Sequence, residues 1–315
     1  ACCGLPRCPV GGLEEKRPAE IVEETIFIQS QDSETFCTWR GAPLCKDVVW
    51  DPPPSHPDAL PLKLLQNSTG SGEQGTVLWS SSVGLAKALE SELLPRAFWP
   101  GKMCCEVGSG AGLCGLAAAR AGGEVLMTDQ SRVLPLLRHN VAANRDHVPT
   151  PPKVRELLWG TGLSGLSHGF DFVFGSDLTY QMEHLAPLLE TLLQLCWGPE
   201  RETQGLFDAP DQLYEDAASG RLATVNIPLF GAAECPTLDV WREQGPFVLL
   251  AYAEERAAVA AFLHLCQRHF EIFTVPHEST PQVPQNIVMC EGYTTRLLFM
   301  RPLTSVPAIN NHVPP

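Results

Sequence analysis

The sequence predicts an α/β fold: a doubly wound, mostly parallel sheet of seven strands with an antiparallel hairpin at its C-terminal edge. Two observations lead to this prediction. From residue 76 onward, short apolar segments alternate with segments of helical periodicity, which is the pattern of parallel βαβ units. The last two apolar segments, 270–275 and 294–300, have no convincing helix between them, which indicates an antiparallel pair.

The first half of this pattern is regular. Apolar residues at helical spacing follow the serines Ser80-Ser81-Ser82, which offer N-caps for a first helix. A strand at 103–107, a small-residue helix at 113–120 and a strand at 124–129 come next. In the following helix we expect Ser131 as the cap and Pro135 in the first turn, where no amide donor is needed.

The second half gives the remaining strands. Strands are predicted at 154–159 and 170–176, followed by a leucine-rich helix around 185–193. A fifth strand at 247–252 precedes a helix whose apolar face includes Val259 and Cys266. Together with the two late strands, this makes seven.

Composition divides the chain further. Residues 1–75 combine short strand-like pieces with loop signals and are expected to form an extension of the main domain, 76–305, with a tail at 306–315. Residues 198–245 contain nine acidic residues and three arginines. We predict an acidic insertion with little regular structure, whose ends lie at the sheet edge opposite the carboxyl ends of the strands.

Charge and cysteine content limit the function classes. The net charge of −14 argues against a generally basic nucleic-acid-binding surface and against an anionic membrane surface, and no apolar run reaches the roughly 18 residues that span a bilayer. The 12 cysteines include no Cys-x-x-Cys pair, so we predict no metal site. Several lie in apolar stretches, which indicates buried thiols in a reducing compartment, cytoplasmic or also nuclear. A removed targeting segment would leave no trace in this sequence.

A glycine cluster between a predicted strand and helix, Glu106-Val107-Gly108-Ser109-Gly110-Ala111-Gly112, is the most informative segment. Glycines there allow a sharp turn and a close approach of ligand to backbone. A dinucleotide-binding site is the alternative interpretation, but its fingerprint needs a third glycine where this sequence has Leu113, so one residue of the pattern does not match. A carboxylate such as Glu106 would repel pyrophosphate but could receive an amine. These features match S-adenosylmethionine.

Two further segments should face the same pocket. Asp129 ends the next predicted strand, where an acid can accept both ribose hydroxyls. In a doubly wound sheet the ligand lies where the strand order reverses, so the glycine cluster and residues 176–180 should meet there.

A known family shows these elements in the same order: Trp79, Glu106–Gly112, Asp129, Leu158-Trp159-Gly160, Asp171–Tyr180 and Leu250-Ala251-Tyr252. On these residues the chain resembles the Rossmann-like, seven-β-strand S-adenosylmethionine-dependent methyltransferases. Within them it is similar to the protein-lysine methyltransferase branch that includes the enzymes acting on valosin-containing protein and on Hsp70 chaperones. The similarity covers roughly 76–303, apart from the insertion.

The resemblance implies a role for each matching residue. The implied cofactor contacts are Trp79, Gly108, Ser109, Gly110, Asp129, Trp159 and Ser176, with Glu106 near the methionine amino group. Asp177 and Tyr180 form an Asp-x-x-Tyr motif beside the transferred methyl group and are the implied catalytic residues. The resemblance therefore implies an S-adenosylmethionine-dependent protein-lysine N-methyltransferase, and we expect a monomer that acts on a protein substrate.

Other interpretations remain open at this stage. Trp79 and Trp159 could be packing residues. The chain could methylate another protein side chain, RNA or a small molecule, although its acidic charge argues against RNA. It could also be a non-catalytic cofactor-binding scaffold, against which the intact Asp-x-x-Tyr motif argues. We expect the substrate surface in residues 21–75, the loop after Tyr180 and residues 282–293, rather than in the insertion.

Overall fold

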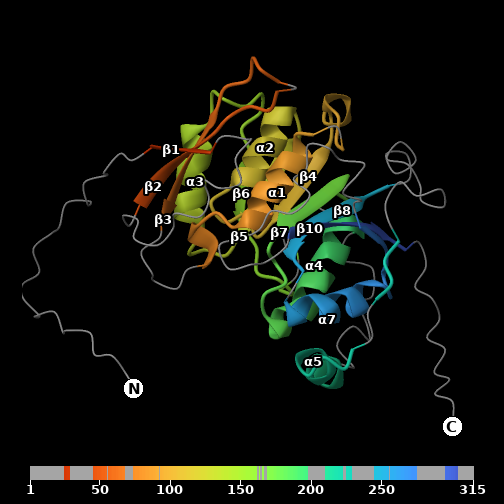
Figure 1. Ribbon diagram of the computed structural model, residues 1–315. Helices are drawn as coiled ribbons and strands as arrows, with labels where there is room; N and C mark the ends of the chain where they lie inside the picture. Colours follow the sequence, from red (N-terminus) through yellow and green to blue (C-terminus); the bar gives the residue numbers. More distant parts are fainter. Residues whose placement is uncertain are drawn as a thin grey trace, which may run out of the picture.

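The computed structural model describes residues 25–28, 45–54, 56–67, 74–91, 93–161, 163, 165–166, 169–197, 210–222, 225–228, 245–254, 256–274 and 295–303. Its main feature is a seven-stranded sheet (Figure 1). In spatial order the strands are β6 (Lys153–Glu156), β5 (Glu124–Asp129), β4 (Met103–Val107), β7 (Phe172–Ser176), β8 (Phe247–Ala253), β10 (Thr295–Pro302) and β9 (Phe270–Thr274).

The pairing of these strands confirms the predicted fold class. Strand β4 pairs in parallel with β5 on one side and with β7 on the other. Chain order runs outward from β4 to β5 and β6, and then returns to the other side of β4 with β7 and β8. Strand β10 is antiparallel to both β8 and β9, which is the predicted edge hairpin.

Helices cover both faces of the sheet (Figure 1). Helices α1 (Ser80–Leu89), α2 (Leu113–Ala121) and α3 (Leu134–Ala143) pack on one face, and α4 (Leu185–Trp197) and α7 (Ala257–Cys266) pack on the other. Short 3-10 turns lie at Gln74–Thr76, Arg96–Phe98 and Met182–His184.

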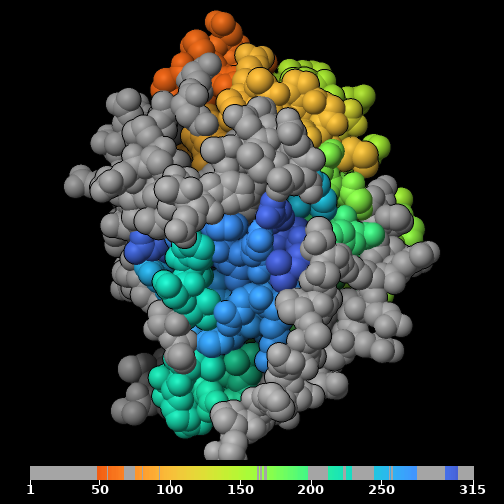
Figure 2. Space-filling view, turned by 90° about the vertical axis from the view of Figure 1, so that its right-hand side faces the viewer, coloured from red at the N-terminus to blue at the C-terminus, as the bar shows by residue number. Residues whose placement is uncertain are grey.

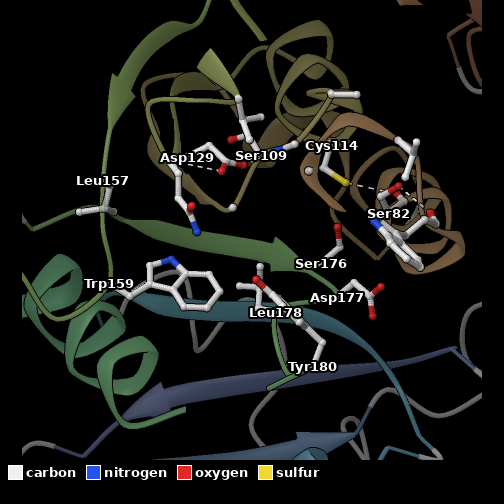
Figure 3. A pocket seen from close by; sticks show the side chains of 18 of the residues that line it. Ser82, Ser109, Cys114, Asp129, Leu157, Trp159, Ser176, Asp177, Leu178 and Tyr180 are labelled. Atoms are coloured by element: carbon white, nitrogen blue, oxygen red, sulfur yellow. Dashed lines mark hydrogen bonds between the residues drawn. The ribbon is translucent and has the colours of Figure 1, made fainter. Parts of the chain in front are cut away.

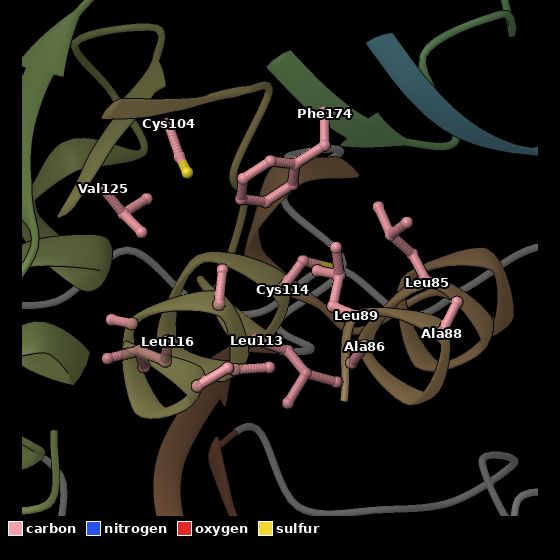
Figure 4. Close-up of a cluster of buried hydrophobic side chains, with 14 of the residues drawn as sticks. Leu85, Ala86, Ala88, Leu89, Cys104, Leu113, Cys114, Leu116, Val125 and Phe174 are labelled. Carbon is pink, nitrogen blue, oxygen red and sulfur yellow. The ribbon is translucent and has the colours of Figure 1, made fainter. Parts of the chain in front are cut away.

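The two-faced core follows from the alternation of side chains along a strand. Cys104 belongs to the core beneath α1 and α2, whereas Cys105 belongs to the core beneath α4 and α7. Figure 4 shows Cys104 and Phe174 of the sheet above Leu113 and Leu89 of the covering helices. The central strands β7 and β8 are buried on both faces, and their sequences contain no charged residue, whereas the edge strand β6 is mostly exposed and charged.

Two predicted helix caps are wrong, and the predicted proline position is confirmed. The N-cap of α1 is Trp79, and the serines lie in its first turn, where the Ser82 hydroxyl donates to the Trp79 carbonyl at 2.6 Å. Residues 130–133 form a turn before α3, whose N-cap is Val133 rather than Ser131. Pro135 lies in the first turn of α3.

A second sheet precedes the main one, with strands β1 (Thr25–Ile28), β2 (Cys45–Trp50) and β3 (Leu62–Asn67). Strand β1 is parallel to β2, and β2 is antiparallel to β3. Sequence reasoning did not identify β3. Its outer edge is paired by two buried side-chain amides, Asn140 of α3 and the C-cap residue Asn144. Asn140 and Asn144 each accept from and donate to the backbone of β3, at Leu65 and Lys63 respectively.

A buried ion pair fastens this second sheet to the main domain. The Arg120 guanidinium on α2 donates to both carboxylate oxygens of Glu90 at 2.7 and 2.9 Å. It also donates to the carbonyls of Trp50, Asp51 and Leu60, and the Trp50 indole donates to Glu90 at 3.0 Å. Burial raises the pKa of Glu90, and the charge of Arg120 opposes that rise.

The insertion contains more regular structure than predicted. Helix α5 (Pro210–Ala218) lies within it and packs against α7, as the adjacent teal and blue surfaces of Figure 2 show. Ala217 is buried on the contacting side because α5 is amphipathic. The Pro228 carbonyl accepts from the amide of Thr274, the last residue of β9, at 3.0 Å. The insertion therefore also contacts β9, the outermost strand on that side of the main sheet.

Two further findings concern the described residues only. None of their helices is long and apolar enough to cross a bilayer. The five cysteines whose side chains are described, Cys104, Cys105, Cys114, Cys196 and Cys266, are buried and form no disulfide. The predicted recognition segment 282–293 lies outside the described residues.

We expect Arg120→Met to lower the free energy of unfolding by about 3–5 kcal/mol, because it leaves the Glu90 carboxylate buried without its partner. Adding Glu90→Gln should recover part of the loss, since a neutral amide costs less to bury. The matched control is Arg221→Met, whose ion pair with Asp216 is exposed and should contribute little. Urea denaturation measures all three. Equal effects of the two single variants would contradict the prediction.

Candidate functional site

A cavity of about 280 Å³ lies at the carboxyl ends of the parallel strands, where strand order reverses between β4 and β7 (Figure 3). The loops after β4, β5, β6, β7 and β8 all contribute to its wall, together with the segment before α1. This is the position at which doubly wound sheets bind ligands.

The glycine turn after β4 forms one wall of the cavity. Gly108, Gly110 and Gly112 have φ values of +64°, +55° and +94°, a backbone conformation that favours glycine. A Cβ atom on Gly110 would lie 3.0 Å from the Gly75 carbonyl oxygen. The turn is fixed to β5, because the Ser109 amide donates to the Thr128 carbonyl at 2.9 Å.

Asp129 connects this turn to the next strand. Its carboxylate accepts from the Gly110 amide and from the Gln130 amide, both at 2.7 Å. Burial raises the pKa of Asp129, and these two hydrogen bonds oppose the rise. Each oxygen keeps acceptor capacity toward the cavity, so the carboxylate can still receive hydroxyl donors from a ligand.

Aromatic and apolar groups line the neighbouring part of the cavity, beyond the end of β6. This strand ends at Glu156, so Leu157, Leu158 and Trp159 lie in the following loop rather than in the predicted strand. The Trp159 ring meets the His184 ring edge to face, with centroids 6.1 Å apart. His184 also contacts the ring of Tyr180, at 6.2 Å between centroids. A flat, half-exposed indole here suits a purine.

Asp177 lies at the end of β7 in an unusual backbone conformation. Its φ of +59° makes it the one non-glycine residue with positive φ in the described part of the chain. Its carboxylate forms a two-pronged ion pair with Arg256, at 2.8 and 3.1 Å. Burial raises the pKa of Asp177, and the Arg256 charge opposes that rise.

Glu106 differs from the other predicted site residues. It is 2% exposed and does not line the cavity. Its carboxylate lies beneath the turn, against α2, where a Cβ on Gly115 would be 2.5 Å from Oε2. Burial raises the pKa of Glu106 to about 8, although a hydrogen bond with Ser109 opposes the rise. Direct contact with a ligand in this cavity would require movement of the turn.

The structure brings the other nine predicted residues together around the cavity: Trp79, Gly108, Ser109, Gly110, Asp129, Trp159, Ser176, Asp177 and Tyr180. Sequence reasoning missed Arg132, His184 and Arg256, which line it too. Arg256 could have been found, because it follows a predicted strand at the ligand-binding edge.

The charges around the cavity balance. Asp129 and Asp177 are matched by Arg132 and Arg256 among the described lining residues. No group of three or more acidic, histidine or cysteine side chains in this part of the chain could hold a metal ion. The site therefore presents charges of both signs to a ligand.

We expect the stability difference between the wild-type chain and Glu106→Gln to depend on pH. The pKa of Glu106 is higher in the folded chain than in the unfolded chain, so the stability from burying its protonated form is present at low pH and is lost as pH rises toward 8. The wild type should therefore lose stability relative to Glu106→Gln between pH 5 and 8. Thermal unfolding of both proteins across this range tests the expectation, which a constant difference would contradict.

Comparison with known proteins agrees with this geometry. The sequence profile of a family described as lysine methyltransferase matches residues 58–204. Protein N-lysine methyltransferase METTL21A of Mus musculus is 37% identical over 122 residues, which cover 38% of this chain and 55% of that protein. EEF1A lysine methyltransferase 3 of Xenopus tropicalis is 32% identical over 123 residues, which cover 39% of this chain and 53% of that protein.

The chain thus spans about half the length of the curated relatives it matches. The matched segment runs from β3 through α4 and includes the glycine turn, Asp129 and Asp177. The resemblance drawn from the sequence is confirmed over residues 58–204, which match the profile of a family described as lysine methyltransferase.

Proposed function

We propose that this chain is an S-adenosylmethionine-dependent protein-lysine N-methyltransferase. The observation that carries the proposal is the placement of Asp177 and Tyr180 on the same cavity as the glycine turn and Asp129. One end of the cavity can hold a nucleoside, and the other presents a carboxylate and a phenol to an acceptor group. The names of the lysine methyltransferases that resemble the chain support the same conclusion.

The residues present fit S-adenosylmethionine. Asp129 can accept the ribose hydroxyls, Trp159 can lie against the adenine, and the glycine turn with Ser176 can contact the methionine portion. The cavity volume is near the lower end of the range for small-ligand sites, about 300 Å³. Glu106 would act through the turn or through water, since it does not reach the cavity wall.

When bound, S-adenosylmethionine supplies a methyl group on a sulfonium; the acceptor nitrogen forms a new N–C bond as the C–S bond breaks, leaving a neutral thioether. The acceptor must carry a free lone pair, so a lysine ammonium, with a reference pKa of about 10.4, first loses a proton to solvent. Asp177 can orient the amine and Tyr180 can hydrogen-bond it, which aligns the nucleophile. Burial raises the pKa of Tyr180, so its phenol stays protonated at neutral pH.

The proposed acceptor is a lysine side chain of a protein substrate. We propose that the chain acts on it as a monomer, in the cytoplasm or nucleus. The buried, unpaired cysteines support a reducing compartment. The relatives are named for methylation of lysine in proteins, one of them in EEF1A. A different protein side chain, RNA, a small molecule and a purely cofactor-binding role are the competing outcomes of the following experiment.

The test is incubation of the purified chain with tritiated S-adenosylmethionine and a cell extract. Gel autoradiography, then mass spectrometry of any labelled band, identifies the acceptor. We expect at least one protein band with methyl-lysine. Label in RNA, in a small molecule or on another side chain would replace the proposed acceptor. Cofactor binding without transfer would indicate a scaffold.

We expect Asp177→Asn to lower the rate of methyl transfer at least a hundredfold while cofactor affinity changes little, because the carboxylate lies at the acceptor end of the cavity. The matched control is Asp171→Asn at the other end of β7, whose carboxylate pairs with Lys102 away from the cavity. Transfer assays and calorimetric titration separate the two effects. Weakened cofactor binding with a normal rate of methyl transfer would contradict the assignment of Asp177 to the acceptor end of the cavity.

We expect Gly110→Ala to weaken cofactor binding at least tenfold, because its Cβ would press on the Gly75 carbonyl across the cavity wall. The matched control is Gly169→Ala, with a φ of +74° but no atom within 4 Å of the new Cβ. Both variants place alanine at a positive φ, which costs about 1–2 kcal/mol of backbone strain in each. A difference in cofactor affinity between them therefore does not come from this shared loss of stability. Calorimetric titration with S-adenosylmethionine gives the affinities, and equal affinities would contradict the assignment of the turn.

A further inference from the structure

We propose that Arg256 is a positioning residue of this site: it holds the Asp177 carboxylate ionised and in one orientation, and its charge favours the neutral form of the acceptor amine. The inference rests on the proposed function and names a residue that the sequence motif does not contain. It starts from the ion pair between the loop after β7 and the loop after β8.

The ion pair is short and largely buried. One Arg256 nitrogen lies 2.8 Å from one carboxylate oxygen of Asp177, and the other donates to the second oxygen at 3.1 Å. The side chains are 18% and 6% exposed, respectively. Only the 3.1 Å contact is a hydrogen bond, and the 2.8 Å contact is an ion contact without hydrogen-bond geometry. Two contacts from one planar guanidinium still restrict the orientation of the carboxylate more than a single ammonium would.

The backbone of Asp177 is held at the same place. Its amide donates to the Ala251 carbonyl of β8 at 2.8 Å, while its φ of +59° is a conformation that non-glycine residues rarely adopt. Backbone and side chain are thus both tied to the end of β8. Strain of this kind persists only where the surrounding structure enforces it, and Arg256 is the partner that enforces the side-chain direction.

The electrostatic surroundings make this partner necessary. Burial raises the pKa of Asp177; Arg256 is the strongest opposing influence, and the Ser81 hydroxyl of α1 acts in the same direction. The charge of Asp177 also raises the pKa of Tyr180, which lies in the same loop. Asp129 and Glu183 raise the pKa of Tyr180 as well, and Arg132 lowers it. Without Arg256 the buried carboxyl would take up a proton at higher pH.

The same charge acts on the acceptor. Both carboxylate oxygens of Asp177 already face Arg256, so an arriving ammonium would meet a neutralised pair rather than a free negative charge. A neutral amine can still donate a hydrogen bond to a carboxylate oxygen while it avoids repulsion from the guanidinium. The pair therefore orients the amine without stabilising its protonated, non-nucleophilic form.

The experiment compares Arg256→Gln, Arg256→Lys and the control Arg132→Gln. Arg132 lines the same cavity and carries the same charge but does not pair with Asp177. Carbon-13 NMR titration follows the Asp177 carboxyl, assigned by its absence in Asp177→Asn. In parallel, the initial rate of labelling of extract protein by tritiated S-adenosylmethionine is measured as a function of pH.

We expect Arg256→Gln to raise the pH at which Asp177 titrates, to move the acid limb of the rate profile upward by the same amount, and to lower the rate at neutral pH at least tenfold. Arg256→Lys should restore the titration but only part of the rate, because a point charge does not fix the carboxylate plane. Arg132→Gln should leave the titration of Asp177 unchanged. Cofactor affinity should stay within threefold in both Arg256 variants.

Unchanged titration and rate profile in Arg256→Gln would overturn the inference. So would a full return of the rate in Arg256→Lys, which would show that charge alone suffices. If Arg256→Gln does not fold, as judged by circular dichroism, folded Arg256→Lys provides the test. A partial rate in that variant supports the inference, and a full rate contradicts it. A wild-type chain that labels no lysine would refute the proposed function instead, while the titration would still report on the ion pair.

Discussion

The reversal of strand order between β4 and β7 is the constraint on which the site depends. Strand β5 lies beside β4 and strand β8 lies beside β7, on opposite sides of this central pair. The loops at the carboxyl ends of the two halves therefore diverge and leave a cavity. The glycine turn and Asp129 come from one side of the reversal, and Asp177 and Arg256 from the other. The division of the cavity into a nucleoside end and an acceptor end follows from this topology.

A second constraint keeps the N-terminal strands attached to this sheet. Arg120 donates five hydrogen bonds in place of water, two to Glu90 and three to backbone carbonyls. These carbonyls belong to Trp50 at the end of β2, to Asp51 after it and to Leu60 before β3. The segment before α1, which lines the cavity, lies between β3 and that pair in the chain. The cavity wall is thus held by interactions that never touch a ligand.

Sequence reasoning predicted the sheet, its edge hairpin and nine residues of the cavity wall, because apolar periodicity and glycine placement report directly on strands and turns. It failed where long-range contacts decide. Strand β3 has a mixed sequence and is fixed by Asn140 and Asn144. Glu106 was expected at the ligand, yet the alternation along β4 turns its side chain toward α2. Arg256 belongs to no motif; its position after a predicted strand was the one signal in the sequence, and its ion pair with Asp177 is what identifies it.

The asparagine pairs along β3 have a consequence for self-association. An edge strand with free amides and carbonyls is a template on which another chain can add a strand. Asn140 and Asn144 occupy those groups at Leu65 and Lys63 with side-chain amides that imitate a neighbouring strand. Helix α3 thereby closes the edge of the small sheet, and the amides that hold it in place also protect the folded chain against aggregation there.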